Sequence, residues 1–274
     1  MKKLHRPSEL FGFPSENNSR EATDARKNYS CPWLRQQCIK KSRLIGPPLG
    51  VCSVFHEGKP HIICPERIAD IKTLDQIAQK VLNKQTGYYL LREVSLGKIG
   101  KLDFVVVEME NDTISRFFAV ERVALDTTNT GEIVKARDDF FKGQMKESYN
   151  YGINWRNVIK RTIPQIIAKG AVFEAWNTYI IWIMQDVFYD YIVKNYELYL
   201  QDEFPKKPST VLFIRSLNYD PMSMIYVFES PPLIKSGSFA NFQRILRPIK
   251  IPPDEQFKRK LIEQIKHQKY IRLK

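Results

Sequence analysis

The chain has few cysteines, and none in its last three quarters. The only four among its 274 residues are Cys31, Cys38, Cys52 and Cys64. No apolar run follows the basic N-terminal residues, which predicts that the chain carries no secretory signal, and disulfides need an oxidising compartment. We therefore favour one shared metal site over two disulfides or four unrelated buried thiols.

The spacing of the cysteines suits such a site. Gaps of six, thirteen and eleven residues separate them along the chain. A looping segment of this kind can converge on a tetrahedral thiolate site, the geometry favoured by zinc or a single iron. A site closed by four thiolates leaves no position for a substrate, so we expect a structural metal. His56 and His61 lie between the last two cysteines, and we expect them outside the ligand set because four thiols suffice.

Long hydrophobic runs are also missing. The longest apolar stretch covers residues 179–184 and ends at Gln185 and Asp186. A helix that crosses a bilayer needs about 20 apolar residues, so we expect no membrane span. Together with the missing signal, this predicts a cytoplasmic protein of the bacterial intracellular type.

Acidic residues are too few to balance the basic ones. The chain has 43 Lys and Arg against 30 Asp and Glu, a net charge of +13. Such an excess favours a polyanionic partner, and nucleic acid is the leading candidate. The alternative is a basic surface that has no specific partner. In a DNA complex, arginine can read guanine, and lysine more often contacts phosphate. The alternative is that these basic side chains only form a solvated surface. The expected DNA-binding residues are Lys40, Lys41, Arg43, Arg156, Lys160 and Arg161.

The order of composition along the chain predicts three parts and no internal repeats. Residues 1–30 are polar and basic and are expected to form an N-terminal arm with little core of its own. Residues 31–67 are rich in proline and contain the cysteines, which predicts a small module organised by its metal. Residues 68–274 are expected to form the main core.

Periodicity within that core predicts an α/β (α+β) fold with a central mixed sheet flanked by helices. Apolar residues recur at helical spacing from Ile68 to near Gly87. Asn154 can cap a helix that reaches about residue 162, and Pro164 begins or kinks a second one. The remaining expected elements are strands at 88–94, 102–109, 116–123, 210–216 and 224–228, a buried helix at 173–196 and a C-terminal helix at 253–268.

Two acids stand out in the expected strands. Asp103 opens one strand and Glu121 lies in an apolar stretch of the next, eighteen positions later. A hairpin that turns at residues 111–112 would place the two carboxylates side by side. Paired carboxylates in an apolar setting are typical of metal ligands or a coupled acid pair, and magnesium is the expected ion. The alternative is an ordinary polar residue near a strand start and a glutamate on the solvent side.

An acid opening one strand and a second acid in the next resembles the PD-(D/E)xK nuclease fold. Together with the upstream cysteines, the chain resembles the NotI family of type II restriction endonucleases. The resemblance covers most of residues 31–170. The matching stretches are the cysteine segment with 50–54 and 62–65, the strand end 120–121 with 125–128, and residues 154–156 leading to 163–165.

The resemblance implies roles for particular residues. Asp103 and Glu121 would bind catalytic Mg²⁺, and Glu93 matches a further acid that such enzymes carry upstream. The motif expects lysine or glutamine two residues after the second acid, where this chain has Val123. Lys101 or Lys98 is expected to supply the missing charge; otherwise metal and backbone suffice, or turnover is poor or absent.

The implied function is that of a type II restriction endonuclease. It would act as a homodimer on a palindromic, GC-rich site in double-stranded DNA and leave a 5′ phosphate by magnesium-dependent hydrolysis. Two alternatives remain open. One is a non-catalytic DNA-binding protein on the same fold, favoured by Val123, and the other is a repair or recombination nuclease that recognises DNA structure.

Overall fold

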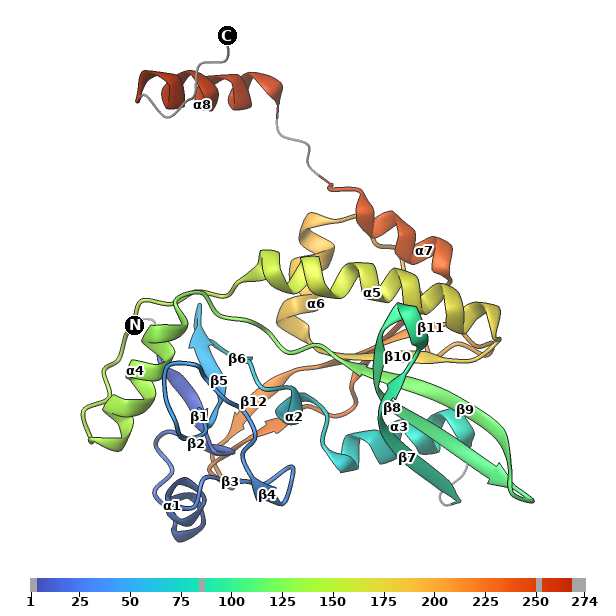
Figure 1. Ribbon diagram of the computed structural model, residues 1–274, viewed down its shortest axis with the longest axis horizontal. Coiled ribbons are helices and arrows are strands. Elements are labelled where there is room, and N and C mark those ends of the chain that lie inside the picture. Colours follow the sequence, from blue (N-terminus) through green and yellow to red (C-terminus); the bar gives the residue numbers. More distant parts are fainter. Residues whose placement is uncertain (1–3, 84–86, 250–252, 268–274) are drawn as a thin grey trace.

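The computed structural model describes residues 4–83, 87–249 and 253–267, and its main feature is a mixed six-stranded sheet (Figure 1). The strand order is β14-β11-β10-β9-β8-β7. The strands β8 and β9 form a long antiparallel hairpin, β9, β10 and β11 run parallel, and β14 returns antiparallel. The strands are β7 (Tyr88–Ser95), β8 (Lys101–Glu110), β9 (Thr113–Arg122), β10 (Ile180–Gln185), β11 (Thr210–Arg215) and β14 (Leu233–Gly237).

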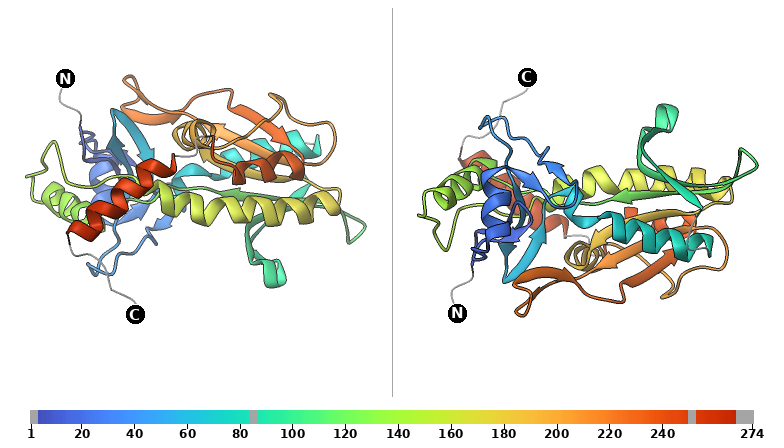
Figure 2. Two further views of the ribbon diagram at one scale, coloured as in Figure 1. Left: turned by 90° about the horizontal axis from the view of Figure 1, so that it is seen from above. Right: turned by 90° about the horizontal axis from the view of Figure 1, so that it is seen from below.

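Helices cover both faces of this sheet. On one face lies α3 (Ile71–Leu82), and the opposite face carries the long helix α5 (Trp155–Ala175), as the two views of Figure 2 show. Alternate residues of the central strands pack into two separate cores, one beneath each face. The expected class, a mixed sheet flanked by helices, is confirmed. The face of α5 is also covered by α6 (Asp186–Asn195), α7 (Phe239–Gln243) and η2 (Arg244–Leu246), and that of α3 by the hairpin β12 (Leu217–Asp220) and β13 (Ile225–Phe228).

One expected element is wrong. The segment 173–196 is not a single buried helix but the end of α5, the strand β10 and the helix α6. Every residue of β10 is buried, because parallel strands with helices on both faces are apolar on both sides. A continuous apolar run of this kind has no alternation, so periodicity cannot distinguish it from a buried helix.

The N-terminal region forms a second sheet of order β2-β1-β5-β6. The expectation of an arm over residues 1–30 is wrong, because β1 is buried along its length and pairs with β5. The division at residue 31 therefore cuts through one sheet. Its elements and neighbours are β1 (Pro7–Leu10), β2 (Phe13–Pro14), α1 (Arg20–Lys27), β3 (Ser30–Cys31), β4 (Gln36–Gln37), β5 (Val51–His56), β6 (Lys59–Ile62), α2 (Pro65–Ile68) and α4 (Thr130–Phe141).

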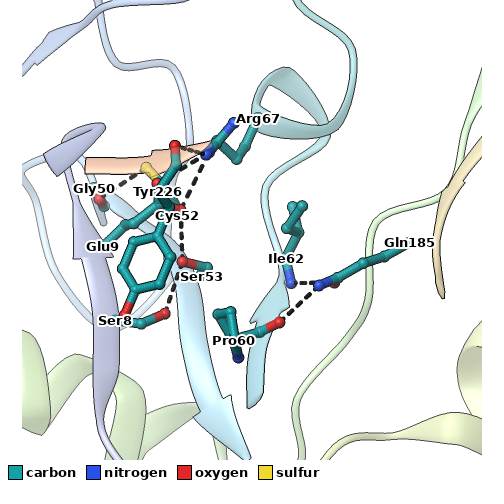
Figure 3. Close-up of polar contacts among 10 residues, drawn as sticks. All are labelled: Ser8, Glu9, Gly50, Cys52, Ser53, Pro60, Ile62, Arg67, Gln185 and Tyr226. Carbon is teal, nitrogen blue, oxygen red and sulfur yellow. Dashed lines mark hydrogen bonds and ion pairs between the residues drawn. The ribbon is translucent and has the colours of Figure 1, made fainter. Parts of the chain in front are cut away.

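Buried polar contacts join the two sheets (Figure 3). The side-chain amide of Gln185, at the end of β10, accepts a hydrogen bond from the Ile62 N–H at 2.8 Å and donates one to the Pro60 carbonyl at 2.6 Å. The guanidinium of Arg67 forms an ion pair with Glu9 at 3.0 Å and donates to the Tyr226 carbonyl at 2.8 Å. The N-terminal sheet is thus fastened to both β10 and β13.

Three other expected segments have counterparts. The helix expected from Ile68 is divided into α2 and α3, because Asp70 caps α3 by accepting from the Thr73 N–H at 2.8 Å. Pro164 lies inside α5, which continues through it to residue 175. The C-terminal helix is α8 (Asp254–Lys266), and the short η1 (Gly97–Ile99) precedes β8. Among the described residues, no helix has the length and apolar content needed to cross a membrane.

Candidate active site

Asp103 and Glu121 lie on neighbouring strands at the same level. The pairing of β8 with β9 matches Phe104 with Val120, so the next step of the same register sets Asp103 opposite Glu121. This adjacency was expected from a turn at 111–112, but that turn pairs Glu110 with Thr113, and it is the one-residue bulge at Glu108/Met109 that brings Asp103 opposite Glu121. Glu121 is only 5% exposed, whereas the side chain of Asp103 is 31% exposed. The pair therefore combines one buried carboxylate with one that solvent can reach.

Burial sets the protonation of Glu121. It raises the pKa of this carboxyl group to about 7, and the negative charge of Asp103 adds to the increase. The ammonium of Lys169 opposes the shift by favouring the charged form. Such repulsion between two carboxylates is what a divalent cation would remove.

The sequence interpretation missed Lys169. This residue of α5 is 2% exposed, and its Nζ donates to Glu121 Oε1 at 2.6 Å and to the Lys101 carbonyl at 2.7 Å. An ammonium group has three donors, so a third remains beyond these two bonds. A buried lysine is thus held beside the acid pair, on the same side of the sheet.

The sequence did contain a signal for this lysine. The buried positions of α5 include Val158, Thr162, Ile166 and Phe173, which recur at helical spacing, and Lys169 falls within the same series. A lysine on the apolar face of a helix is unusual unless it has a partner in the interior. A search for charges on apolar helix faces would therefore have found it.

Asp103 is held by Arg122, the last residue of β9. The backbone N–H of Arg122 donates to Asp103 Oδ2 at 2.9 Å, and its guanidinium lies 3.4 Å from Oδ1. The same guanidinium forms an ion pair with Glu66 at 2.7 Å and covers the ring of Phe104 at 4.7 Å. Glu66, another residue that the sequence interpretation missed, therefore joins the acids through Arg122.

The structure does not gather the other expected residues here. Glu93 has a positive φ of 51°, its side chain is 73% exposed, and it pairs with Lys101 at 3.6 Å. Lys101 contributes only its carbonyl to the site, Lys98 is exposed in η1, and Val123 is buried in the core. The ammonium group that contacts Glu121 is thus that of Lys169, whereas those of Lys101 and Lys98 are exposed.

The expected basic patch of the cysteine segment and Arg161 of the helical patch line one groove. A cavity of about 760 Å³ lies between the cysteine segment, the loop after β9 and the start of α5. Its walls include Lys40, Lys41, Arg43 and Arg161, together with Asn154 and Asn157. Arg156 and Lys160 are exposed on the same helix but do not line the cavity.

Two of these cations are already engaged. The ammonium of Lys40 donates to the carbonyls of Val51 at 3.1 Å and Ile63 at 2.6 Å, and burial lowers its pKa. The guanidinium of Arg161 donates to Asp126 at 3.2 Å and to the Ala124 carbonyl at 2.8 Å. These two residues shape the groove, and the exposed cations are freer to contact a ligand.

The four cysteines are reduced and gather around Cys64. Cys52 forms a side-chain hydrogen bond with Cys64, and the thiols of Cys31 and Cys38 interact electrostatically with the same residue. The hydrogen bond with Cys52 is the main reason that the pKa of Cys64 falls to about 6, and the nearby ammonium of Lys40 contributes. The donor set is one that zinc or iron accepts. In the described ranges, however, no three His, Cys, Asp or Glu side chains are already arranged to hold a metal ion.

Comparisons with known proteins do not assign this site. No protein family matches the chain, and no curated protein matches it.

Proposed function

We propose that the chain is a magnesium-dependent DNA endonuclease of the PD-(D/E)xK type, acting as a type II restriction enzyme. The observation that carries the proposal is the trio of Asp103, Glu121 and Lys169. Two carboxylates at the end of a β-hairpin with one lysine beside them supply the chemical groups of that motif. The lysine reaches the acids from a helix and not from the strand position of Val123.

The acid pair fits Mg²⁺. This ion takes oxygen ligands and is commonly held by one or two carboxylates, with waters and substrate phosphates completing its shell. Asp103 and Glu121 would hold it, with Asp103 on the accessible side. When bound, the ion would activate a water molecule and stabilise charge on the scissile phosphate.

The remaining roles fall to the side chains of this chain. Lys169 keeps Glu121 oriented at 2.6 Å and has a further N–H for an oxygen of the substrate. Arg122 holds Asp103 through its backbone N–H at 2.9 Å, which fixes that carboxylate at the end of its strand. Positioning of this kind accounts for much of the catalysis of phosphoryl transfer.

Helix α5 connects this site to the basic groove. Arg161 lines the groove and Lys169 lies at the acids, eight residues later on one helix. A helix rises 1.5 Å per residue, so the two positions are about 12 Å apart. We propose that DNA lies along the groove, in contact with Lys41 and Arg43 in its wall and with Arg156 and Lys160 beside it on α5, and that a homodimer matches a palindromic site.

We also propose that the cysteine cluster holds one structural Zn²⁺ or iron ion. The other three thiols share Cys64 as a neighbour, and Lys40 supplies a positive charge that would compensate thiolates. The ion would be held by Cys31, Cys38, Cys52 and Cys64. Its role would be to fix the cation-bearing loop 40–44 at the edge of the groove.

Plasmid cleavage with and without Mg²⁺ tests the catalytic proposal. We expect discrete fragments from the wild-type chain and at least a hundredfold less cleavage from Asp103→Ala, Glu121→Gln and Lys169→Met. Lys142→Met is a matched control, because it removes an exposed lysine outside the site. Gel-shift affinity should be retained in all four variants.

Three outcomes would contradict the proposal. Salt-sensitive binding without cleavage by the wild-type chain would instead identify a non-catalytic DNA-binding protein. Full activity of Asp103→Ala or Lys169→Met would mean that the acid pair and the lysine are structural. Cleavage only of branched or mismatched DNA would point to a repair or recombination nuclease.

A further inference from the structure

A second cavity lies away from the acid pair, on the face of the sheet that α3 covers. Its volume is about 530 Å³, and its walls come from the turn after β3, the start of α3 and the hairpin β12–β13. Two arginines, Arg67 and Arg215, line it together with Lys72. Nothing in the proposed nuclease mechanism uses these residues.

The two guanidinium groups share one aromatic ring. The Cζ atom of Arg215 lies 3.9 Å from the centre of the Phe228 ring and that of Arg67 lies 4.7 Å from it. Arg67 is neutralised by Glu9 at 3.0 Å, as Figure 3 shows. Arg67 also covers the ring of Trp33 at 5.0 Å, so the cationic wall continues into an aromatic one.

Arg215 has no such counterion. Within the described parts of the chain, no carboxylate lies within ion-pair distance of it, and its buried Nε has no hydrogen-bond partner. Its terminal nitrogen donates to the hydroxyl of Thr73. Burial lowers the pKa of Arg215 to about 10; the charge of Asp70 opposes this shift and that of Arg67 adds to it, so the group remains charged at neutral pH. A partly buried charge without an ion-pair partner is costly, and an anion from outside would compensate it.

The surroundings favour a phosphate. Asp70 is the one acid in the cavity wall, and it is occupied in capping α3, where it accepts from Thr73. Lys72 adds an exposed ammonium at the rim. Arginine recognises phosphate through paired hydrogen bonds, and the cations outnumber the acids here.

We propose that this cavity binds one nucleotide unit, with its phosphate at Arg215 and Lys72 and its base against Trp33 and Phe13. The aromatic and apolar part of the wall suits a flat ring, because bases stack on such side chains. The unit is either a free nucleoside monophosphate or the 5′ end of a single strand. The same phosphate and base chemistry serves both.

Calorimetric titration of the full chain tests the proposal with dAMP, deoxyadenosine and a 5′-phosphorylated oligonucleotide that begins with dA. We expect dAMP to bind with a Kd on the order of 0.1–1 mM, and deoxyadenosine at least tenfold more weakly. Arg215→Gln should weaken dAMP binding at least tenfold, and Lys72→Gln severalfold. Arg92→Gln is the matched control, because Arg92 also covers a phenylalanine ring, that of Phe104 at 5.3 Å, but lies outside the cavity.

Each result has one meaning. An oligonucleotide that binds at least tenfold more tightly than dAMP, and that loses this advantage in Arg215→Gln, identifies a strand end, and equal affinities identify a free nucleotide. Equal affinities for dAMP and deoxyadenosine, or no binding of dAMP at millimolar concentration, would overturn the proposal. If Arg215→Gln does not fold, unchanged binding by Lys72→Gln, an exposed substitution, would overturn it. Asp103→Ala should bind dAMP as the wild type does, which separates this result from the nuclease test.

Discussion

Lys169 and Glu121 form the most consequential pair of residues, because each is buried and compensates the other. Removing one partner of such a pair leaves a buried charge and typically costs about 3–5 kcal/mol. We expect Lys169→Met to lower the free energy of unfolding by about 2–4 kcal/mol at pH 8. This loss is smaller than the typical one because Glu121 can take up a proton when its partner is removed. Urea denaturation measures the change.

The double variant Glu121→Gln/Lys169→Met removes both charges and should recover most of that loss. A double variant less stable than Lys169→Met would show that the two residues do not act as a pair. Recovery of stability without recovery of cleavage is the expected combination.

His61 should give the stability a measurable pH dependence. Burial lowers its pKa to about 4 from the ordinary 6.5. The unfolded chain therefore binds more protons between these two values, so His61 makes the free energy of unfolding rise as the pH increases from about 4 to 6.5. The difference in stability between wild type and His61→Phe should change by up to about 3 kcal/mol over that interval.

Comparing the two proteins removes the contribution of groups common to both, such as Glu121. Thermal or urea unfolding at several pH values measures the difference. Parallel pH profiles for the two proteins would mean that His61 does not titrate differently in the folded state.

At the scale of elements, Gly170 sets how closely α5 packs on β11. A Cβ at this position would lie 2.9 Å from the hydroxyl of Thr210, which is itself buried. We expect Gly170→Ala to destabilise the chain by about 1–3 kcal/mol, although alanine normally favours a helix. Because Lys169 is the preceding residue, DNA cleavage should also fall.

Gly131 is the matched control for that substitution. It lies in α4, and a Cβ at this position would have Leu44 Cδ1 as its nearest neighbour at 3.9 Å, an ordinary contact. Gly131→Ala should therefore be neutral or stabilising by up to about 1 kcal/mol. Equal effects of the two substitutions on the melting temperature would refute the packing argument.

The elements also show what the sequence could predict. The sequence predicts strands at 88–94, 102–109 and 116–123 because turn residues separate these short runs, and they match β7, β8 and β9. The strand β10 was not identified, because a strand that is buried on both faces has no alternation. Turn geometry places Asp103 and Glu121 near each other, but their direct pairing also depends on the one-residue bulge at Glu108/Met109, which the sequence did not predict.

The positions of Lys169 and Glu66 beside the acids could not be predicted from local sequence patterns. Their contacts with Glu121 and Arg122 span 48 and 56 residues, respectively. Contacts of that length depend on how the helices pack on the sheet, which one sequence does not specify. The buried strand β1 was missed because its four residues, Pro7 to Leu10, include a proline, a serine and a glutamate and resemble a polar arm.

For the whole molecule, the excess of positive charge should appear in the salt dependence of DNA binding. Each phosphate contact releases counterions and steepens the dependence of log K on log salt by about one unit. We expect Lys41→Gln/Arg43→Gln to reduce the slope by about two and to weaken binding. Lys80→Gln, on α3 at the opposite face of the sheet, should leave the slope unchanged.

The cysteine cluster should make folding depend on metal. We expect about one zinc or iron ion per chain by elemental analysis, and a loss of melting temperature on treatment with a strong chelator. Cys64→Ser should abolish metal binding, because Cys64 is the shared neighbour of the other three thiols. A metal-free wild-type chain with an unchanged melting temperature would exclude a structural ion.

The side-chain amide of Gln185 connects the N-terminal sheet to the six-stranded sheet. Both of its hydrogen bonds end on backbone groups of β6, and the next residues along that strand lead into Cys64. The strand β9, which carries Glu121, pairs directly with β10, the strand that Gln185 terminates. Oxidation of the thiols should therefore disturb the acid pair as well, and deletion of the first sixty residues should destabilise the six-stranded sheet.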